Sequence, residues 1–401
     1  MTSIASTLVL WAAVAATDSG IIVGENIRAS RDETPYVEPY VACHPVRSGA
    51  CIAAATKFSG AGPDTPVLLV SSDGGATWQE KALPIGALQH AVDAWVTFAE
   101  SGIAYATFLV IEPGDSKTKI AVFRSGDAGN SWTDTSTITA EGSFDRPTVI
   151  ARGRDVVIAA EHRGAVAVLH SGDEGRSFRS PRLFRPNRNL DHNAMNPMWH
   201  GSSLVVPYVD YGETLSGSRL GMVQTSDFGR RWSVPLVVAD VPRRFPGNAH
   251  FAVSGTSLYA AFASGTADAR AVSVASSTDG TKWRVPVRVS HDGAQAFRPA
   301  IAISSRGSIG TTWIETEAGC TRLWFSVSRD GARTFSKPVP VSEDLSCGNT
   351  LPNRAAYERW EHGGDYFGLA SDGENFIAMW PDARMGTFQI YAATITVRST
   401  P

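Results

Sequence analysis

Seven polar residues occupy equivalent places in the chain, each just ahead of a short apolar segment with strand-like composition. They are Glu38, Asp93, Arg146, Asn196, Asn248, Arg298 and Asp365. If these segments are the inner strands around one axis, the seven side chains form a ring at one mouth of a central channel. Carboxylates can move protons or attack a sugar, and guanidinium groups can hold an anion, so the ring could hydrolyse a glycoside. The alternative is a solvated, charge-balanced funnel without a substrate.

A second set of acids ends the next strand-like segment in four of the units. They are Glu161, Asp210, Glu315 and Asp382. We expect them just outside the ring, where two carboxyls could act as the proton donor and the nucleophile or base of a glycosidase. Arg384, two residues after Asp382, is a further candidate for substrate binding. The alternative is ion pairing within each unit, between Glu315 and Arg298 and between Glu161 and Arg146.

Histidines offer a second chemical route. His90, His192, His250 and His362 fall in or near connections on the same side of the predicted fold. A polysaccharide lyase can pair His with Tyr to abstract a proton beside a uronate carboxylate that Arg neutralises. His250 and Tyr366, with Arg298 and Arg146, could do this. No His/Cys cluster has zinc spacing, and there is no phosphate-binding Gly loop, so we expect no metal and no cofactor.

A repeat shows which elements must position these residues. The stretch Ser71-Ser72-Asp73-Gly74-Gly75-Ala76-Thr77-Trp78 has the residues of a tight hairpin turn, with an Asp that can bond its own backbone and Gly residues that accept positive φ. We call this stretch and its copies the aspartate turns. Their aspartates are Asp73, Asp127, Asp173, Asp227, Asp279 and Asp330. Spacings of 46 to 54 residues between β signals are typical of propeller blades.

The aspartate turn resembles the Asp box, or BNR repeat, of the sialidase-like β-propellers. The resemblance covers nearly the whole chain, and it implies that the aspartates are structural: each locks its turn while the aromatic residue wedges between neighbouring sheets. The chain is thus expected to be an all-β propeller of four-stranded blades. Alternation of the strands puts the aspartate turns on one face, here the turn face, and the starts of the inner strands on the opposite top face.

The resemblance extends to part of the sialidase site. Arg146-Pro147 and Arg298-Pro299 resemble the family's Arg-x-Pro element, and Asp365-Tyr366-Phe367-Gly368-Leu369 resembles its Tyr-centred motif. Members bind the substrate carboxylate with three arginines and attack with a Tyr assisted by a Glu, while an Asp acts as acid. Asp64 lies where that acid is expected. The first arginine is missing, because Val37 takes its place and Glu38 beside it would repel a carboxylate.

We predict seven blades, with six, the number that sialidases have, as the alternative. The seventh unit, from Asp365 to about Val397, has no aspartate turn and only three strands. Its missing outer strand is expected from Ile21 to Ala29, which would close the ring and remove an open sheet edge. Residues 21–398 should therefore form one propeller domain.

Features outside the repeat indicate export. Residues 1–16 resemble a signal peptide, with an apolar core from Ile4 to Ala16; the alternative is an N-terminal arm that packs or stays disordered. The four cysteines make two sensible pairs, Cys43 with Cys51 across a hairpin and Cys320 with Cys347 between top-face loops, the alternative being free thiols. We expect a secreted or periplasmic monomer. The net charge of −3 argues against nucleic-acid and membrane-surface partners, and no later segment is apolar enough to span a membrane.

These features together predict a carbohydrate-active, exo-acting glycoside hydrolase, sialidase-type or acting on a related sugar, with its site on the top face. The catalytic candidates are Tyr366, Asp365, Glu315 and Asp64. The candidates for substrate binding are Arg146, Arg298, Asp93, Glu38, Asn196, Asn248, His250, Asp210, Asp382 and Arg384. The alternatives are a non-catalytic propeller that binds a glycan or protein, and the His/Tyr lyase.

Overall fold

The computed structural model describes residues 20–60, 62–84, 90–111, 117–138, 143–185, 191–211, 218–241, 249–266, 269–352 and 354–398. The expected signal peptide, residues 1–16, and Asn248 of the polar ring lie outside these ranges. All structural statements below concern the described residues.

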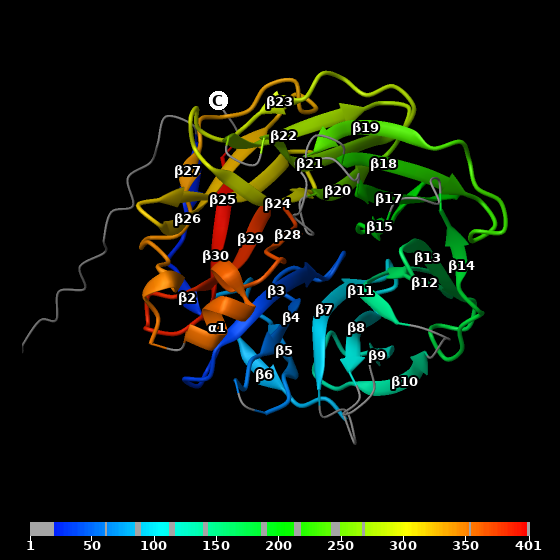
Figure 1. The fold of residues 1–401 in the computed structure, drawn as a ribbon, viewed down its shortest axis with the longest axis horizontal. Helices are drawn as coiled ribbons and strands as arrows, with labels where there is room; N and C mark the ends of the chain where they lie inside the picture. The colour runs from blue at the N-terminus through cyan, green and yellow to red at the C-terminus, as the bar shows by residue number, and fades with distance from the viewer. Residues whose placement is uncertain are drawn as a thin grey trace, which may run out of the picture.

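Seven antiparallel sheets radiate around a central axis, and Figure 1 looks down that axis. Strands follow one another from the axis outward in each of the first six. The first three blades contain β3 (Tyr36–Cys43), β4 (Cys51–Lys57), β5 (Thr65–Ser71) and β6 (Gln79–Lys81); β7 (Ala91–Phe98), β8 (Ala104–Ile111), β9 (Thr118–Ser125) and β10 (Thr133–Ile138); and β11 (Phe144–Arg152), β12 (Asp155–His162), β13 (Ala165–Ser171) and β14 (Arg182–Phe184). The predicted all-β propeller with seven blades is thus confirmed.

The next three blades repeat this order, except that the inner strand of the fourth is split in two. They contain β15 (Asp191–Ala194), β16 (Met198–His200), β17 (Ser203–Tyr211), β18 (Ser218–Thr225) and β19 (Leu236–Val241); β20 (Ala249–Ser254), β21 (Ser257–Thr266), β22 (Ala269–Ser277) and β23 (Val287–Arg288); and β24 (Ala296–Ile303), β25 (Ile309–Glu317), β26 (Cys320–Ser328) and β27 (Val339–Pro340).

The seventh blade is closed by the N-terminal segment, as predicted. β28 (Gly368–Asp372), β29 (Asn375–Asp382) and β30 (Gln389–Val397) form its inner three strands. β1 (Ile21–Val23) and β2 (Ile27–Arg28) both pair antiparallel with β30, Ile21 opposite Val397 and Ile27 opposite Ala392. Among the seven described sheets, the segment thus covers the one edge that the repeat leaves without an outer strand of its own.

The aspartate turns share one hydrogen-bond scheme. In the first, Ser71 Oγ accepts the Gly75 amide at 2.9 Å, Asp73 Oδ1 accepts the Thr77 amide at 2.9 Å, and the Trp78 indole donates to the Gly75 carbonyl at 3.1 Å. The same bonds recur at Asp127 and Ser131. These bonds help hold the pKa of Asp73 below its usual range, although burial opposes them. Every carboxylate here is committed to its own turn.

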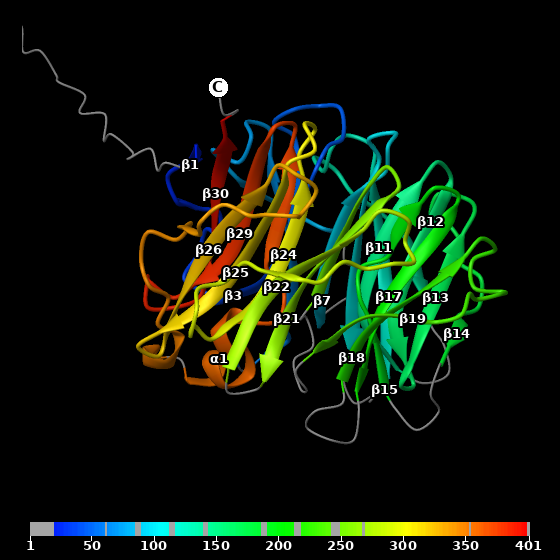
Figure 2. The same ribbon diagram turned by 90° about the horizontal axis from the view of Figure 1, so that it is seen from above.

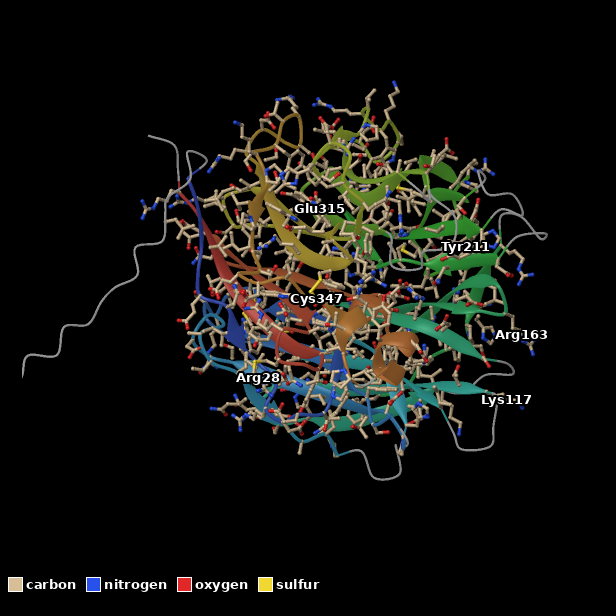
Figure 3. All side chains as sticks on the ribbon, turned by 60° about the vertical axis from the view of Figure 1, so that its left-hand side comes forward. Arg28, Lys117, Arg163, Tyr211, Glu315 and Cys347 are labelled. Carbon is tan, nitrogen blue, oxygen red and sulfur yellow. A yellow bond between two sulfur atoms is a disulfide. The ribbon has the colours of Figure 1, made fainter. Side chains whose placement is uncertain are left out.

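A connection on the top face contains the described helices. It holds η1 (Gly348–Thr350), α1 (Arg354–Arg359) and η2 (Glu361–Gly363) between the sixth and seventh blades. Figure 2 places α1 at one end of the strands and the C-terminal end of β30 at the other. The predicted disulfides Cys43–Cys51 and Cys320–Cys347 are both present, and the second fastens this connection to the sixth blade (Figure 3). None of the described helices has the length and apolar character of a membrane span.

The closing strand should tolerate a charge on one side only. Ile21 is 2% exposed, whereas Ile22 points to the other side of the strand and is half-buried. We expect Ile21→Asp to lower the free energy of unfolding by on the order of 3 kcal/mol, because it buries an unpaired carboxylate. Denaturant unfolding would measure the loss, with Ile22→Asp as the matched control. Equal effects of the two substitutions would contradict the role of Ile21 in closure.

Candidate active site

The polar ring is built from a repeated distortion of the inner strands. In four blades the register slips at the ring position, between Val37/Tyr40, Val92/Trp95, Asp145/Thr148 and Phe297/Ala300. The ring residues there have left-handed backbone, with φ of 55° at Glu38 and 52° at Asp93, Arg146 and Arg298. This conformation is costly for a residue other than glycine, and bulges commonly re-aim a side chain. Its recurrence indicates that the strain serves to direct these side chains.

Asp365 is the point at which four blades meet. It precedes β28 in the seventh blade, and its carboxylate forms salt bridges with Arg146 from the third blade and, at 3.4 Å, with Arg298 from the sixth. Its backbone amide donates to Glu38 Oε1 from the first blade at 2.8 Å. The arginines and acids therefore converge across the top of the channel. Within its own blade Arg146 also lies 4.0 Å from the carboxylate of Asp145.

Burial and charge separate the acids of this cluster. Burial opposes ionisation of Asp365, but the guanidinium groups of Arg146 and Arg298 hold its pKa below the usual range. Glu38 is 2% exposed, and burial together with the charges of Asp93 and Asp365 raises its pKa well above normal. Burial and the neighbouring Asp145 raise the pKa of Asp93 to about 7. The pKa of Asp365 is thus lowered beside two carboxyls whose pKa values are raised, that of Asp93 to about 7.

A pocket opens beside this cluster and encloses about 440 Å³. Tyr40 stacks on Trp95 with ring centroids 3.5 Å apart, and Tyr366 meets Trp95 edge-on at 6.0 Å. The Arg146 guanidinium lies 5.5 Å from the centroid of the Tyr366 ring. The residues that line the pocket are Tyr40, Trp95, Arg146, Thr148, Ala194, Met195, Asn196, Ala249, His250, Pro299, Asp365, Tyr366 and Phe367. Aromatic faces beside a few converging polar groups are typical of small-ligand sites.

The polar wall opposite Asp365 is uncharged. Tyr40 Oη and His250 Nε2 lie 2.9 Å apart, and His250 Nδ1 contacts the backbone of Ile301 at 3.1 Å. Burial lowers the pKa of His250 to about 4 and raises that of Tyr366 well above its usual value. Both side chains are therefore neutral at pH 7. Asn196 completes this wall, and its amide exchanges two hydrogen bonds with Phe251 of the next blade.

The outer acids of the sixth and seventh blades lie away from the pocket. Glu315 accepts hydrogen bonds from the His291 amide and from the indole of Trp313, and His291 Nδ1 lies 2.8 Å from its other oxygen. Asp382 is likewise bonded by the Trp380 indole at 3.0 Å and by Arg384 at 2.7 Å. A Trp two residues before each acid thus satisfies it locally.

Three further acids are also engaged outside the pocket. Asp64 accepts the Ser59 amide at 3.2 Å and lies 3.5 Å from His90. Asp210 lies 3.2 Å from His192, and burial raises its pKa. Glu161 accepts the Gly164 amide at 2.9 Å, in place of the predicted alternative partner Arg146. The structure brings together the ring residues Glu38, Asp93, Arg146, Arg298 and Asp365, and it leaves the outer acids at the blade ends.

The sequence analysis missed the aromatic part of the pocket. Tyr40 and Trp95 each stand two residues after a ring residue, Glu38 and Asp93, and Thr148 and His250 have the same offset from their ring positions. The recurrence of this offset in four units was a usable signal, although a bulge lies between Glu38 and Tyr40 and between Asp93 and Trp95, so simple strand alternation does not explain it. No group of three or more metal-ligating residues occurs among the described side chains.

Comparisons with known proteins identify the fold but not a family. No protein-family model matches the chain, and no curated protein matches it in sequence. A solved protein of unknown function from Dyadobacter fermentans aligns over 94% of this chain and 100% of its own, with 11% identity and a TM-score of 0.56. The α-L-arabinanase of Penicillium chrysogenum aligns over 78% and 94%, with 13% identity and a TM-score of 0.51.

A third structure extends this group. The α-L-arabinofuranosidase Arb93A of Fusarium graminearum aligns over 76% of this chain and 92% of its own, with 14% identity and a TM-score of 0.50. The structural neighbours thus include glycoside hydrolase propellers at low sequence identity. At such identity the likeness shows the fold alone.

Proposed function

We propose that this protein is an exo-acting glycoside hydrolase whose active site is the top-face pocket. The observation that carries the proposal is the Asp365 carboxylate, which lines the pocket, is kept ionised by two arginines and stands in a cluster with acids whose pKa values are raised. Glycoside hydrolysis needs such a division, since one carboxyl must donate a proton while another stabilises or attacks the sugar.

Roles follow from the protonation states. Asp365 would be the ionised carboxylate that faces the anomeric carbon. Asp93, with a pKa of about 7, would be the proton donor, and Asp93 Oδ2 accepts the backbone amide of Arg146 at 3.3 Å, which links the two acids through one residue. Tyr366 keeps its proton, so we assign it a hydrogen bond to the sugar and no role as nucleophile. Trp95 and Tyr40 would pack against the apolar face of the ring.

The substrate we favour is a neutral sugar of the arabinose type over a sialic acid. Both arginines already bind Asp365, so a substrate carboxylate would have to compete with it. Val37 stands where sialidase-like proteins are expected to have their first arginine, and Glu38 beside it would repel a substrate carboxylate. Two solved propellers that resemble this fold are named as an α-L-arabinanase and an α-L-arabinofuranosidase, and this supports the choice of an arabinose-type sugar.

One observation favours a second candidate function, a propeller that binds a glycan without cleaving it. The carboxylate of Asp365 is bound by guanidinium groups from two sides, which lowers its nucleophilicity as well as its pKa. In that case the same pocket would bind sugar, and only turnover would be absent.

Hydrolysis of a panel of aryl glycosides, with α-L-arabinofuranoside and sialoside included, is the direct test. We expect release of the aryl group from a pentoside, and loss of at least about a hundredfold in kcat/KM for Asp365→Asn, because the developing positive charge would lose its counter-charge. Asp292→Asn is the control, since that side chain is 99% exposed. No turnover on any member, with sugar binding retained in calorimetry, would select the binding protein instead.

The pH profile tests the assignment of Asp93. A donor must be protonated, so kcat/KM should fall as the pH rises through about 7, the pKa of Asp93. The acid limb should lie below the usual carboxyl range, because the two arginines lower the pKa of Asp365. Asp93→Asn should abolish most activity together with the limb near pH 7. A limb that persists unchanged in residual Asp93→Asn activity would assign the donor elsewhere.

Two substitutions separate the ring from the scaffold. Arg298→Gln removes one cation from Asp365 and should cost activity about ten- to a hundredfold, the worth of one charge-assisted contact. Asp227→Ala removes the acceptor of the Arg231 amide in the fourth aspartate turn, and it should lower Tm while the folded protein stays active. Thermal melting and turnover would be measured on both. Early melting of Arg298→Gln with full activity would make the ring structural.

A further inference from the structure

Two clefts at the turn face contain arginines from neighbouring blades. The first is a cleft open to solvent between the third and fourth blades, and it is lined by Arg179, Arg182, Arg230, His170 and Phe228, among others. The second is a similar open cleft between the fifth and sixth blades. It is lined by Ser257, Tyr259, Ser276, Ser277, Thr278, Arg284, Asp330, Gly331 and Arg333. Both lie at the opposite strand ends from the active-site pocket.

The two clefts are built from the same positions of the repeat. Arg179 and Arg284 each follow the aromatic residue of an aspartate turn, and Arg230 and Arg333 each stand three residues after the aspartate of the next turn. The boundary between the first and second blades has Gln79 and Asn130 at these places. Paired arginines are therefore a property of particular boundaries and not of the repeat as such.

The arginines of the first cleft have their charge available. Among the described residues, no salt bridge or hydrogen bond engages the guanidinium groups of Arg179, Arg182 or Arg230, while the acid beside them, Asp227, is bound by Arg231 at 3.0 Å. The floor is ordered: His170 stacks on Phe228 with ring centroids 3.5 Å apart and is bonded to Asp155 at 2.7 Å.

A buried donor or acceptor in the same floor also lacks a partner. His170 is 7% exposed, and its Nδ1 makes no hydrogen bond. A buried polar atom without a partner is unfavourable unless water or a ligand supplies one. His170 Nε2 bonds the carboxylate of Asp155, so Nδ1 of a neutral ring is an acceptor and suits a sugar hydroxyl, while the three guanidinium groups favour an anionic group on the same ligand.

We propose that these clefts bind an acidic polysaccharide, one anionic sugar in each. Arginine forks match carboxylate and sulfate oxygens, and each cleft is lined by arginines from two neighbouring blades. The hydroxyls of Ser257, Ser276 and Tyr259 in the second cleft suit a sugar's polar edge. A polymer that reaches both clefts would gain avidity from their simultaneous occupation. This anchoring is separate from catalysis and stands whether or not the top-face pocket hydrolyses glycans.

Affinity electrophoresis of the full chain in gels with heparin, polygalacturonate or neutral arabinan tests the proposal. We expect retardation by at least one acidic polymer. The substitution of Arg179, Arg182 and Arg230 by Ser should raise the dissociation constant about tenfold or more. The matched control replaces three exposed arginines elsewhere, Arg31, Arg47 and Arg306, and changes the net charge equally. Sulfate or carboxylate preference follows from comparing heparin with polygalacturonate.

Each other outcome would overturn the proposal. If neither heparin nor polygalacturonate retards the wild-type protein, the proposal is wrong. Equal weakening by the cleft variant and the control means that general charge, and not the cleft, binds the polymer. Retardation by single-stranded DNA as strong as by heparin assigns the clefts to polyanions at large. Turnover of aryl glycosides by the cleft variant should remain at the wild-type level. The electrophoresis therefore tests polysaccharide binding, and the turnover assay tests the hydrolase proposal independently.

Discussion

The carboxylate of Asp365, held between buried arginines from two other blades, is the interaction on which the top face depends. It joins the third, sixth and seventh blades across the channel, and its amide reaches the first. A buried ion cluster is weak evidence for stability, because the cost of removing charges from water offsets much of the attraction. Apolar side chains could close the channel as well. The cluster therefore points to a function for this mouth of the propeller beyond holding the blades together.

Strain and rigidity are divided between the two ends of the strands. At the turn face, each aspartate accepts hydrogen bonds from backbone amides of its own turn, and these bonds fix the strand ends. At the top face, four inner strands bulge and hold Glu38, Asp93, Arg146 and Arg298 in left-handed backbone. Such conformations persist only where the surroundings over-determine them. At two of these positions the support comes from a neighbouring blade, since the Asp365 amide donates to Glu38 and the Arg146 amide donates to Asp93.

Much of the fold could be predicted because it is repeated. Six aspartate turns at regular spacing, and a seventh unit that lacks one, were sufficient for the blade number, the closure by Ile21 and the ring register. Both disulfides followed from that topology. The outer acids show where pattern fails. Glu315 and Asp382 have the spacing of a catalytic set, but a Trp two residues earlier donates to each. A spacing does not reveal which partner a side chain prefers once neighbouring blades pack.

The aromatic wall of the pocket shows a different limit of sequence reasoning. Tyr40 and Trp95 come from adjacent blades, and neither has a special role until the bulges turn Glu38 and Asp93 out of register. The bulge inserts an extra residue, so the ring residue and the residue two positions later no longer follow simple alternation. In a propeller with aspartate turns, the positions of the bulges in the inner strands therefore matter most for the site. The extra residue at each bulge decides which side chains share the pocket with the ion cluster, and hence what the site can bind.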